Sequence, residues 1–168
     1  MPLLKNIMYR GEYATEDPEE AKTFFDRFVL IGRKPTDYVI KHSLKGIRKI
    51  EIEDRGISNL HMLIVEANGY YPISLSSRSQ AKLIRECKEI PVKPFFLDDL
   101  SSEIPTKASL YEENTANAIF RLTEEDNSLI AEILRTMHVP LKNGDQIELA
   151  KGAFTAEFYI KEDLYLIN

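Results

Sequence analysis

One stretch decides the predicted fold of this chain: residues 60–75, which read LHMLIVEANGYYPISL. Its first eight residues are mostly apolar and suit a buried strand. Asn68-Gly69 follows, and this pair favours a type I′ turn because both central residues of that turn need a positive φ. The chain then returns through a second strand that contains Pro72. Since proline has no N–H, we expect this strand to lie at a sheet edge or to hold a bulge.

The residues that follow the hairpin have the pattern of a helix. Ser77 and Gln80 have the spacing of a capping box, so we expect a helix from there to about Glu89. On such a helix Cys87 would be a small buried residue. Its outward side would carry four cations: Arg78, Lys82, Arg85 and Lys88.

The residues before the hairpin predict a strand, a helix and a basic segment. We expect a short strand at Ile7–Tyr13 and a helix from Asp17-Pro18 to Gly32, because the phenylalanines of residues 24–29 fit a helical period. A strand at Tyr38–Ser43 comes next, although a short helix over 37–45 also fits. A strand at Ile47–Glu53 precedes the central hairpin.

The C-terminal part predicts one more hairpin, one helix and three short strands. Residues 101–107 mark a boundary, and Ala108–Tyr111 would pair with Ala116–Leu122 across a turn at Glu113-Asn114. Thr123 would begin a helix with acidic residues in its first turn. The expected core stripe of this helix is Leu129, Ile130, Ile133, Leu134 and Met137. Asn143-Gly144 turns the chain, and the last strands are expected at 146–150, 154–160 and 164–167.

Together these elements predict an α+β fold: a mostly antiparallel sheet of short strands and hairpins, packed with three main helices. With 168 residues and 43% hydrophobic content, the chain fits a single domain over 1–168, in which 1–100 and 108–168 could form sub-layers.

The charge is uneven along the chain. The formal net charge is −5, yet residues 1–100 hold 16 Lys+Arg against 15 Asp+Glu, and residues 101–168 hold 6 against 12. Such a balance argues against a polybasic nucleic-acid binder. A single cysteine fits a reducing compartment, and neither a signal peptide nor a membrane-spanning run is expected. The predicted location is cytoplasmic, with no membrane partner.

No catalytic signature stands out. The chain has no phosphate-binding glycine loop, no cysteine-pair zinc site and no nucleophile elbow. We expect His61 to be a satisfied internal histidine and His138 to lie just past a helix end, where a cation favours the helix dipole. Of the three histidines only His42 is linked to function. No cofactor and no resident metal are expected; a divalent metal would enter only if the protein is a nuclease.

The basic residues form the candidate binding set. Residues 33–49 hold six Lys and Arg against Asp37 alone. If the hairpins bring this segment and the outward face of the predicted helix together, they form one phosphate-binding surface. The alternative is two ordinary solvated faces. The candidate nucleic-acid contacts are His42, Lys45, Arg48, Arg78, Lys82 and Arg85.

The order of elements over about residues 48–141 resembles that of the bifunctional nuclease family. The resemblance rests on residues 68–75 (NGYYPISL), 80–84 (QAKLI), 91–94 (PVKP), 98–100 (DDL) and the later strand and helix. It implies a small intracellular α+β domain that cleaves RNA and DNA. Two polar motifs of that family are absent, since residues 94–98 and 122–127 differ from them. The resemblance therefore implies the fold more than the activity.

Two functions remain open on the sequence. The first is a nucleic-acid-acting domain that binds RNA or DNA through the basic residues, with catalysis undecided. The second is a non-enzymatic regulator or inhibitor that binds a protein through its edge strands and its acidic C-terminal surface. A homo-oligomer is compatible with either.

Overall fold

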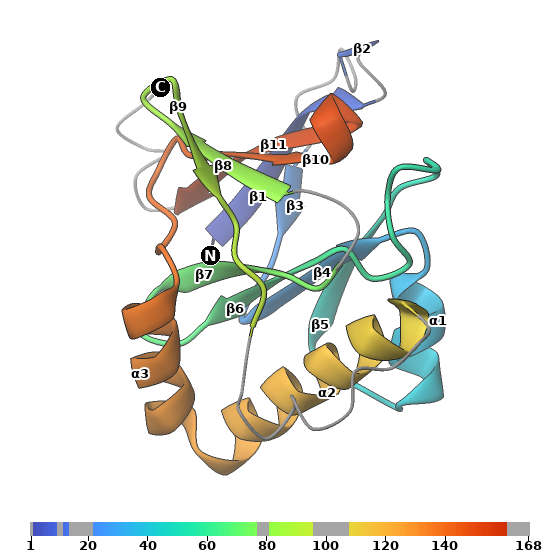
Figure 1. The fold of residues 1–168 in the computed structure, drawn as a ribbon, viewed down its shortest axis with the longest axis vertical. Coiled ribbons are helices and arrows are strands. Elements are labelled where there is room, and N and C mark those ends of the chain that lie inside the picture. The colour runs from blue at the N-terminus through green and yellow to red at the C-terminus, as the bar shows by residue number, and fades with distance from the viewer. Residues whose placement is uncertain (1, 10–11, 14–21, 77–80, 96–107, 161–168) are drawn as a thin grey trace.

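The computed structural model describes residues 2–9, 12–13, 22–76, 81–95 and 108–160. It confirms an α+β fold, in which these residues form two β-sheets and three α-helices. The four-stranded sheet lies in the middle, with the seven-stranded sheet on one face and the helices on the other (Figure 1). All strand pairs are antiparallel except β4 with β5.

The four-stranded sheet has the order β5-β4-β6-β7. Its strands are β4 (Phe28–Gly32), β5 (Ile47–Glu51), β6 (Met62–Glu66) and β7 (Tyr70–Ser74). The predicted central hairpin is confirmed as β6–β7, and Asn68 and Gly69 both have positive φ in its turn. β7 lies at the sheet edge, as Pro72 predicts.

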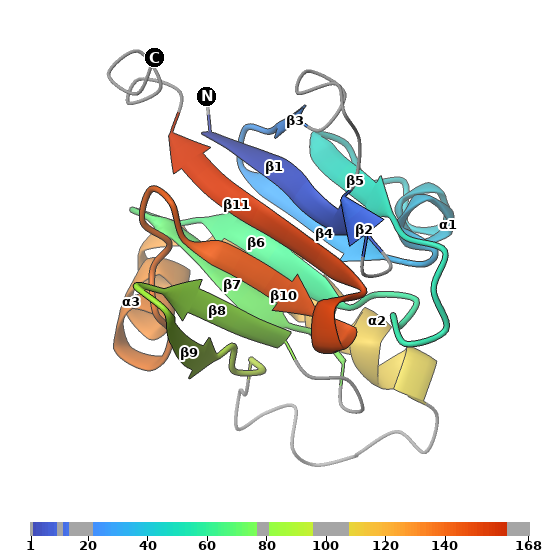
Figure 2. The same cartoon turned by 90° about the horizontal axis from the view of Figure 1, so that it is seen from above.

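The seven-stranded sheet joins the two ends of the chain. Its main path is β2-β1-β11-β10-β8-β9, and β3 pairs with β1 (Figure 2). The strands are β1 (Pro2–Tyr9), β2 (Glu12–Tyr13), β3 (Lys22–Phe24), β8 (Ala81–Arg85), β9 (Lys88–Pro91), β10 (Gln146–Leu149) and β11 (Phe154–Ile160). The sheet therefore mixes strands from residues 1–100 and 108–168.

The middle sheet is buried on both faces because its strands alternate between two cores. Val29 and Ile31 of β4 face the seven-stranded sheet, whereas Leu30 faces the helices. Met62 and Ile64 of β6 alternate with Leu63 and Val65 in the same way. This explains why both strands are continuous apolar runs rather than alternating ones.

The helices are α1 (Pro35–Lys41), α2 (Ala108–Glu125) and α3 (Asn127–Met137). The preferred prediction of a strand at Tyr38–Ser43 is wrong, and a short helix, the alternative, is present with earlier bounds. It connects the parallel strands β4 and β5, a connection for which a helix is the usual solution.

The predicted helix ending at Gly32 is wrong over its described part, where β3 and β4 stand; residues 14–21 lie outside the described residues. Phe25 and Phe28 fit a helical spacing but serve two different cores. Phe25 contacts Tyr70 and Phe158 between the sheets, and Phe28 packs edge-on against Phe120 of α2.

The predicted helix over 77–89 is also wrong from residue 81 on, where β8 and β9 form a hairpin; residues 77–80 are not described. Its turn is Glu86-Cys87, with φ of 52° and 63°, and Cys87 is exposed rather than buried. Pairing of β8 with β10 gives Ala81 and Leu83 a place in the inter-sheet core, which overrides the local helical pattern.

The predicted hairpin over 108–122 is a single helix, α2. Glu112, Ala116, Ile119, Phe120 and Thr123 are buried along one helical face. The next helix therefore begins at Asn127 rather than Thr123, and the Asp126 carboxylate accepts a hydrogen bond from the Leu129 N–H as its cap.

The predicted elements at both ends are partly confirmed. In α3 Ile130 and Leu134 are buried as expected, whereas Leu129 and Met137 are each 43% exposed. The N-terminal strand is β1 followed by β2, and β10 and β11 are confirmed. The expected strand at 164–167 and the segment Phe96–Leu100 lie outside the described residues. No helix in the described part of the chain is long and apolar enough to span a membrane.

Candidate functional site

At one end of the middle sheet, β4 runs into α1, and the 52–61 loop folds against this connection (Figure 1). The Arg33 N–H donates to the Ser58 carbonyl at 3.0 Å, and the Lys34 N–H donates to the Asn59 carbonyl at 3.1 Å. The Ile52 N–H donates to the Gly32 carbonyl at 2.9 Å. We call Arg33, Lys34, Ser58, Asn59 and Ser76 the loop-end site.

Gly32 allows the two backbones to lie this close. A Cβ placed on Gly32 would stand 2.2 Å from the Asn59 carbonyl oxygen and 2.8 Å from its carbon. Both of these are backbone atoms, so no side-chain rotation could make room. The close approach sets the position of Arg33, which follows directly in the chain.

The Ser58 side of the site is held by hydrogen bonds. Its N–H donates to Nδ1 of the buried His61 at 3.1 Å, and its hydroxyl shares a 2.7 Å hydrogen bond with the Ser76 hydroxyl. Because Nδ1 accepts, the ring proton of a neutral His61 is on Nε2. His61 is internal, as expected, and its Nδ1 contact holds the Ser58 backbone. Ser76 is itself buried, and the Ser74 hydroxyl donates to its carbonyl.

The cations of this site carry no internal partner. Arg33 and Lys34 are exposed, and within the described part of the chain their side chains form no hydrogen bond or ion pair. Arg55, in the same 52–61 loop, is also exposed. A guanidinium presents several N–H donors in a fixed fork, which matches phosphate and carboxylate oxygens. The site can therefore bind an anion without first breaking an internal contact.

Helix α2 contacts the 52–61 loop through a buried carboxylate. The buried Glu112 carboxylate accepts a hydrogen bond from the Leu60 N–H at 3.3 Å. Next to it, Glu113 forms an ion pair with Lys41 of α1 at 3.1 Å. A cavity of about 110 Å³ lies between these residues and Lys34, and Asp37 also lines it.

Tyr38 lines the same cavity. Its hydroxyl donates to the Asn117 side-chain oxygen, and its ring stacks with Phe120. Burial, together with the nearby Glu113 carboxylate, raises the pKa of Tyr38 above its ordinary value. The phenol is therefore neutral at pH 7 and acts as a hydrogen-bond donor.

The predicted nucleic-acid contacts fall into two groups. His42, Lys45 and Arg48 lie on or beside α1 and β5 at the middle sheet, whereas Lys82 and Arg85 lie on β8 of the other sheet. Arg78 is outside the described residues. The helix face that would have joined them does not exist, because β8 and β9 stand there.

The β8 cations are already paired. Arg85 donates two hydrogen bonds to the Asp145 carboxylate, at 3.0 and 2.7 Å, and one to the Pro140 carbonyl at 2.8 Å. Asp145 is 2% exposed and also accepts the Lys142 N–H at 2.7 Å. Lys82 pairs with Glu89 at 3.2 Å. The Arg85 contacts hold the β8–β9 hairpin against the turn before β10, whereas the Lys82–Glu89 pair lies within the hairpin.

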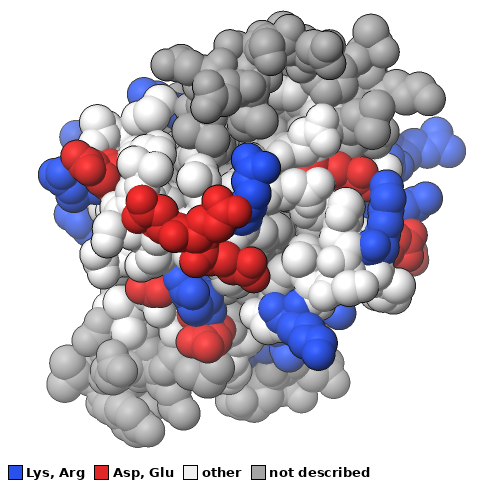
Figure 3. Space-filling view, turned by 90° about the horizontal axis from the view of Figure 1, so that it is seen from below, with Lys and Arg blue, Asp and Glu red and all other residues white. Residues whose placement is uncertain are grey.

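In the α1–β5 group, Lys45 and Arg48 differ from the paired β8 cations. Lys45 and Arg48 are exposed and, like Lys49 beside them, form no ion pair with a described residue. The His42 ring packs 4.6 Å from the Tyr38 ring, and its Nε2 is buried. On the helical face of the molecule, Lys and Arg are separated by acidic and uncharged surface rather than forming one patch (Figure 3).

A metal site would need several ligand side chains grouped around one ion. In the described ranges no three His, Cys, Asp or Glu side chains are grouped so that they could bind one ion. Three acidic residues of α2 and the α2–α3 junction have other roles. Glu112 anchors a loop, Glu113 pairs with Lys41, and Asp126 caps α3.

The sequence predictions missed the loop-end site. Gly32 was interpreted as a helix cap, which placed Arg33 at the start of a long basic segment. Ser58 was assigned to an ordinary turn. Two signals could have pointed to the site: a glycine directly after the apolar run 28–31, and Ser58 three residues before a histidine that opens a buried strand.

Comparison with known proteins does not assign this chain to a family. No protein-family model and no curated protein matches this chain. Among solved structures the chain is similar to the yeast Pml1 splicing factor, in a study of its integration into the RES complex. The match has a TM-score of 0.41 and 14% identity, and it covers 94% of this chain and 78% of that chain. No functional conclusion follows from a likeness at this level.

Proposed function

We propose that this chain is a non-enzymatic protein-interaction domain whose loop-end site binds an anionic segment of a partner protein. The observation that carries the proposal is Arg33. Its guanidinium is exposed and has no described partner, while its backbone is fixed against the Ser58 loop. An unneutralised cation on a fixed backbone is suited to an external anion, because binding must order its side chain but not the loop.

The chemistry of the site favours a phosphorylated side chain as that anion. A phosphate ester offers three acceptor oxygens and about two negative charges. Arg33 and Lys34 are cationic donors, and the Ser58 hydroxyl of the adjoining loop can donate as well when the Ser76 hydroxyl is the donor in their shared hydrogen bond. A carboxylate presents two oxygens and one charge, so it would use fewer of these donors. Recognition of phosphorylated or acidic motifs by arginine is a recurring mode of peptide binding.

The test compares phosphorylated peptides with matched unphosphorylated ones. A degenerate peptide library fixed on phosphoserine or phosphothreonine is bound to the full chain, and affinity is measured by fluorescence anisotropy. We expect Arg33→Met to weaken binding at least tenfold and Ser58→Ala to weaken it less, because a charge-assisted hydrogen bond contributes more than a neutral one. Arg48→Met, at another exposed arginine, is the matched control.

Two results would overturn the proposal. One is equal binding of phosphorylated and unphosphorylated peptides; the other is equal loss from Arg33→Met and Arg48→Met. Tighter binding of an aspartate-substituted library than of the phosphorylated one would assign the site to acidic segments instead.

A second candidate function is nucleic-acid binding at the α1–β5 surface. The observation that favours it is the set of unpaired exposed cations Lys45, Arg48 and Lys49. Binding to phosphates through such a surface would fall steeply with salt. Lys45→Met with Arg48→Met should then weaken binding to labelled RNA or DNA, whereas Lys82→Met should not, because Lys82 is already paired.

Three further properties stay predictions: cleavage of the bifunctional-nuclease kind, a cytoplasmic location and self-association.

A further inference from the structure

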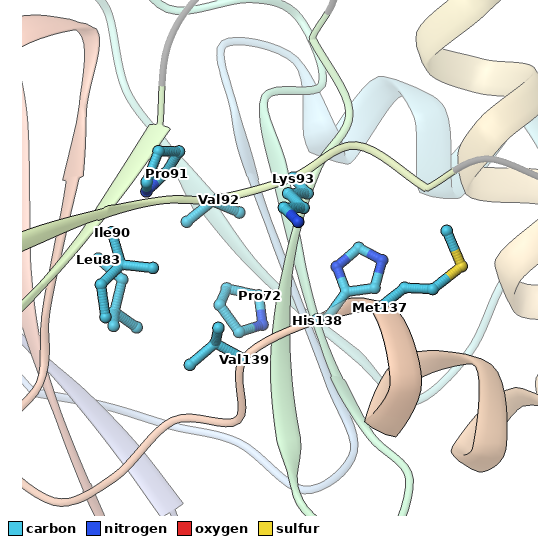
Figure 4. Close-up of a pocket in the computed structure, with 9 residues that line it drawn as sticks. All are labelled: Pro72, Leu83, Ile90, Pro91, Val92, Lys93, Met137, His138 and Val139. Carbon is cyan, nitrogen blue, oxygen red and sulfur yellow. The ribbon is translucent and has the colours of Figure 1, made fainter.

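A second concave region has a lining that shares no residue with the loop-end site. It is a cavity of about 190 Å³ between the edge strand β7, the β8–β9 hairpin and the end of α3 (Figure 4). Its walls are mostly apolar, with Pro72, Leu83, Ile90 and Val92 among them. Among the described lining residues, only Lys93 and His138 carry a charge or a titratable group.

His138 is a buried polar group with no partner. The residue is 7% exposed, and neither ring nitrogen has a hydrogen-bond partner. The backbone holds it in place: its N–H donates to the Leu134 carbonyl at 2.8 Å, and the ring stacks on Phe95. Leaving such a group unsatisfied costs about 1–3 kcal/mol. The imidazole in the wall of this apolar cavity therefore has hydrogen-bonding capacity that a ligand can use.

The protonation state of His138 defines what it can offer. Burial, together with the nearby Lys93 ammonium, lowers the pKa of His138 to about 4. The ring is therefore neutral at pH 7 and presents one N–H donor and one acceptor. It can donate to an anion but adds no charge of its own.

Lys93 supplies the charge. It is exposed, no described residue forms an ion pair with it, and no carboxylate lines the cavity. Its backbone is fixed, because the Ser74 N–H donates to its carbonyl at 3.1 Å. Lys93 and His138 lie beside each other at one side of the cavity, and the apolar walls lie at the other (Figure 4). A ligand that fits both sides needs an apolar body and one anionic end.

We propose that this cavity binds a small apolar monocarboxylate, with its hydrocarbon part against Pro72, Leu83 and Val92 and its carboxylate between Lys93 and His138. The size fits, because an apolar cavity of about 150 Å³ holds benzene. The proposal is independent of the loop-end site, which lies on other residues.

The probe is hydrocinnamate, a phenyl ring joined to a carboxylate, added to the full-length protein. Binding is measured by NMR titration of backbone amides. We expect saturable shifts at residues around the cavity and no shifts at Ser58. Lys93→Met should weaken binding at least fivefold, and the uncharged hydrocinnamamide should bind at least fivefold more weakly than the acid. Lys88→Met, at an exposed lysine of β9, is the matched control.

His138→Phe tests the second polar contact and should weaken the acid more than the amide. Because this change could disturb the end of α3, the result for Lys93→Met, at an exposed residue, decides whether the proposal holds. Three results would each overturn the proposal: no saturable shifts at millimolar hydrocinnamate, equal affinity for the acid and the amide, or equal effects of Lys93→Met and Lys88→Met. Arg33→Met should leave binding unchanged.

Discussion

The two ends of this molecule use the same kinds of polar side chain in opposite ways. At the loop-end site Arg33 and Lys34 stand free on a backbone that is locked by hydrogen bonds. At the end formed by α3, β10 and the β8–β9 hairpin, Arg85 is neutralised by the buried Asp145. The difference teaches that counting cations does not locate a binding site. A cation that the fold already uses has little left to offer a ligand, whereas an unpaired one on a rigid support has much.

The largest expected effect is at Gly32, on which the loop-end site depends. Gly32→Ala places a methyl group 2.2 Å from the Asn59 carbonyl oxygen, so the 52–61 loop must move. We expect the free energy of unfolding to fall by about 4 kcal/mol, measured by urea unfolding. Gly46→Ala is the control: nothing lies near its Cβ, and a positive φ alone should cost about 1 kcal/mol. Equal losses in the two variants would mean that the backbones are not locked together.

The second-largest expected effect is a loss of stability at acid pH, caused by His138 at the end of α3. The pKa of His138 is about 4 in the folded chain and near 6.5 when unfolded, so between these values only the unfolded chain binds this proton. Stability from this residue is complete above pH 6.5 and is lost as the pH falls to 4, by about 3 kcal/mol. Urea unfolding at pH 7 and at pH 4 should show a smaller difference in His138→Phe than in the natural chain. An unchanged difference would contradict the buried neutral ring.

Arg85 separates a structural cation from a free one. Arg85→Met leaves the Asp145 carboxylate buried with only the Lys142 N–H, so we expect a loss of about 2 kcal/mol. Lys82→Met removes an exposed ion pair on the same strand and should cost less than about 1 kcal/mol. Thermal unfolding of both variants side by side measures the contrast. A larger loss from Lys82→Met would contradict it.

The smallest expected effect on stability is at Arg33. Arg33→Met should change the free energy of unfolding by no more than about 0.5 kcal/mol, because its side chain has no described partner to lose. The same variant should lose anion binding, as proposed above. Destabilisation similar to that of Arg85→Met would show that Arg33 has a structural contact, and the contrast between the two ends would then fail.

Local sequence patterns predicted part of the fold and little of the site. The β6–β7 hairpin, its Asn68-Gly69 turn, the edge position of Pro72, and strands β10 and β11 all follow from residues close together in sequence. The errors came where contacts between distant segments override a local pattern. Ala81 and Leu83 became strand residues through pairing with β10, and Phe25 and Phe28 are not on one helix because they pack into two different cores.

The sequence alone determined the class of fold, because apolar alternation, turn residues and helix caps are local and physically strong. Only the tertiary structure decided which charges are free. Arg85 and Asp145 are 60 residues apart, and α1 and β5 separate Gly32 from Asn59 in the sequence. Pairing between such distant residues depends on which strands become neighbours. Strand order is fixed by how the whole chain buries its apolar surface, and no short stretch of sequence contains that information.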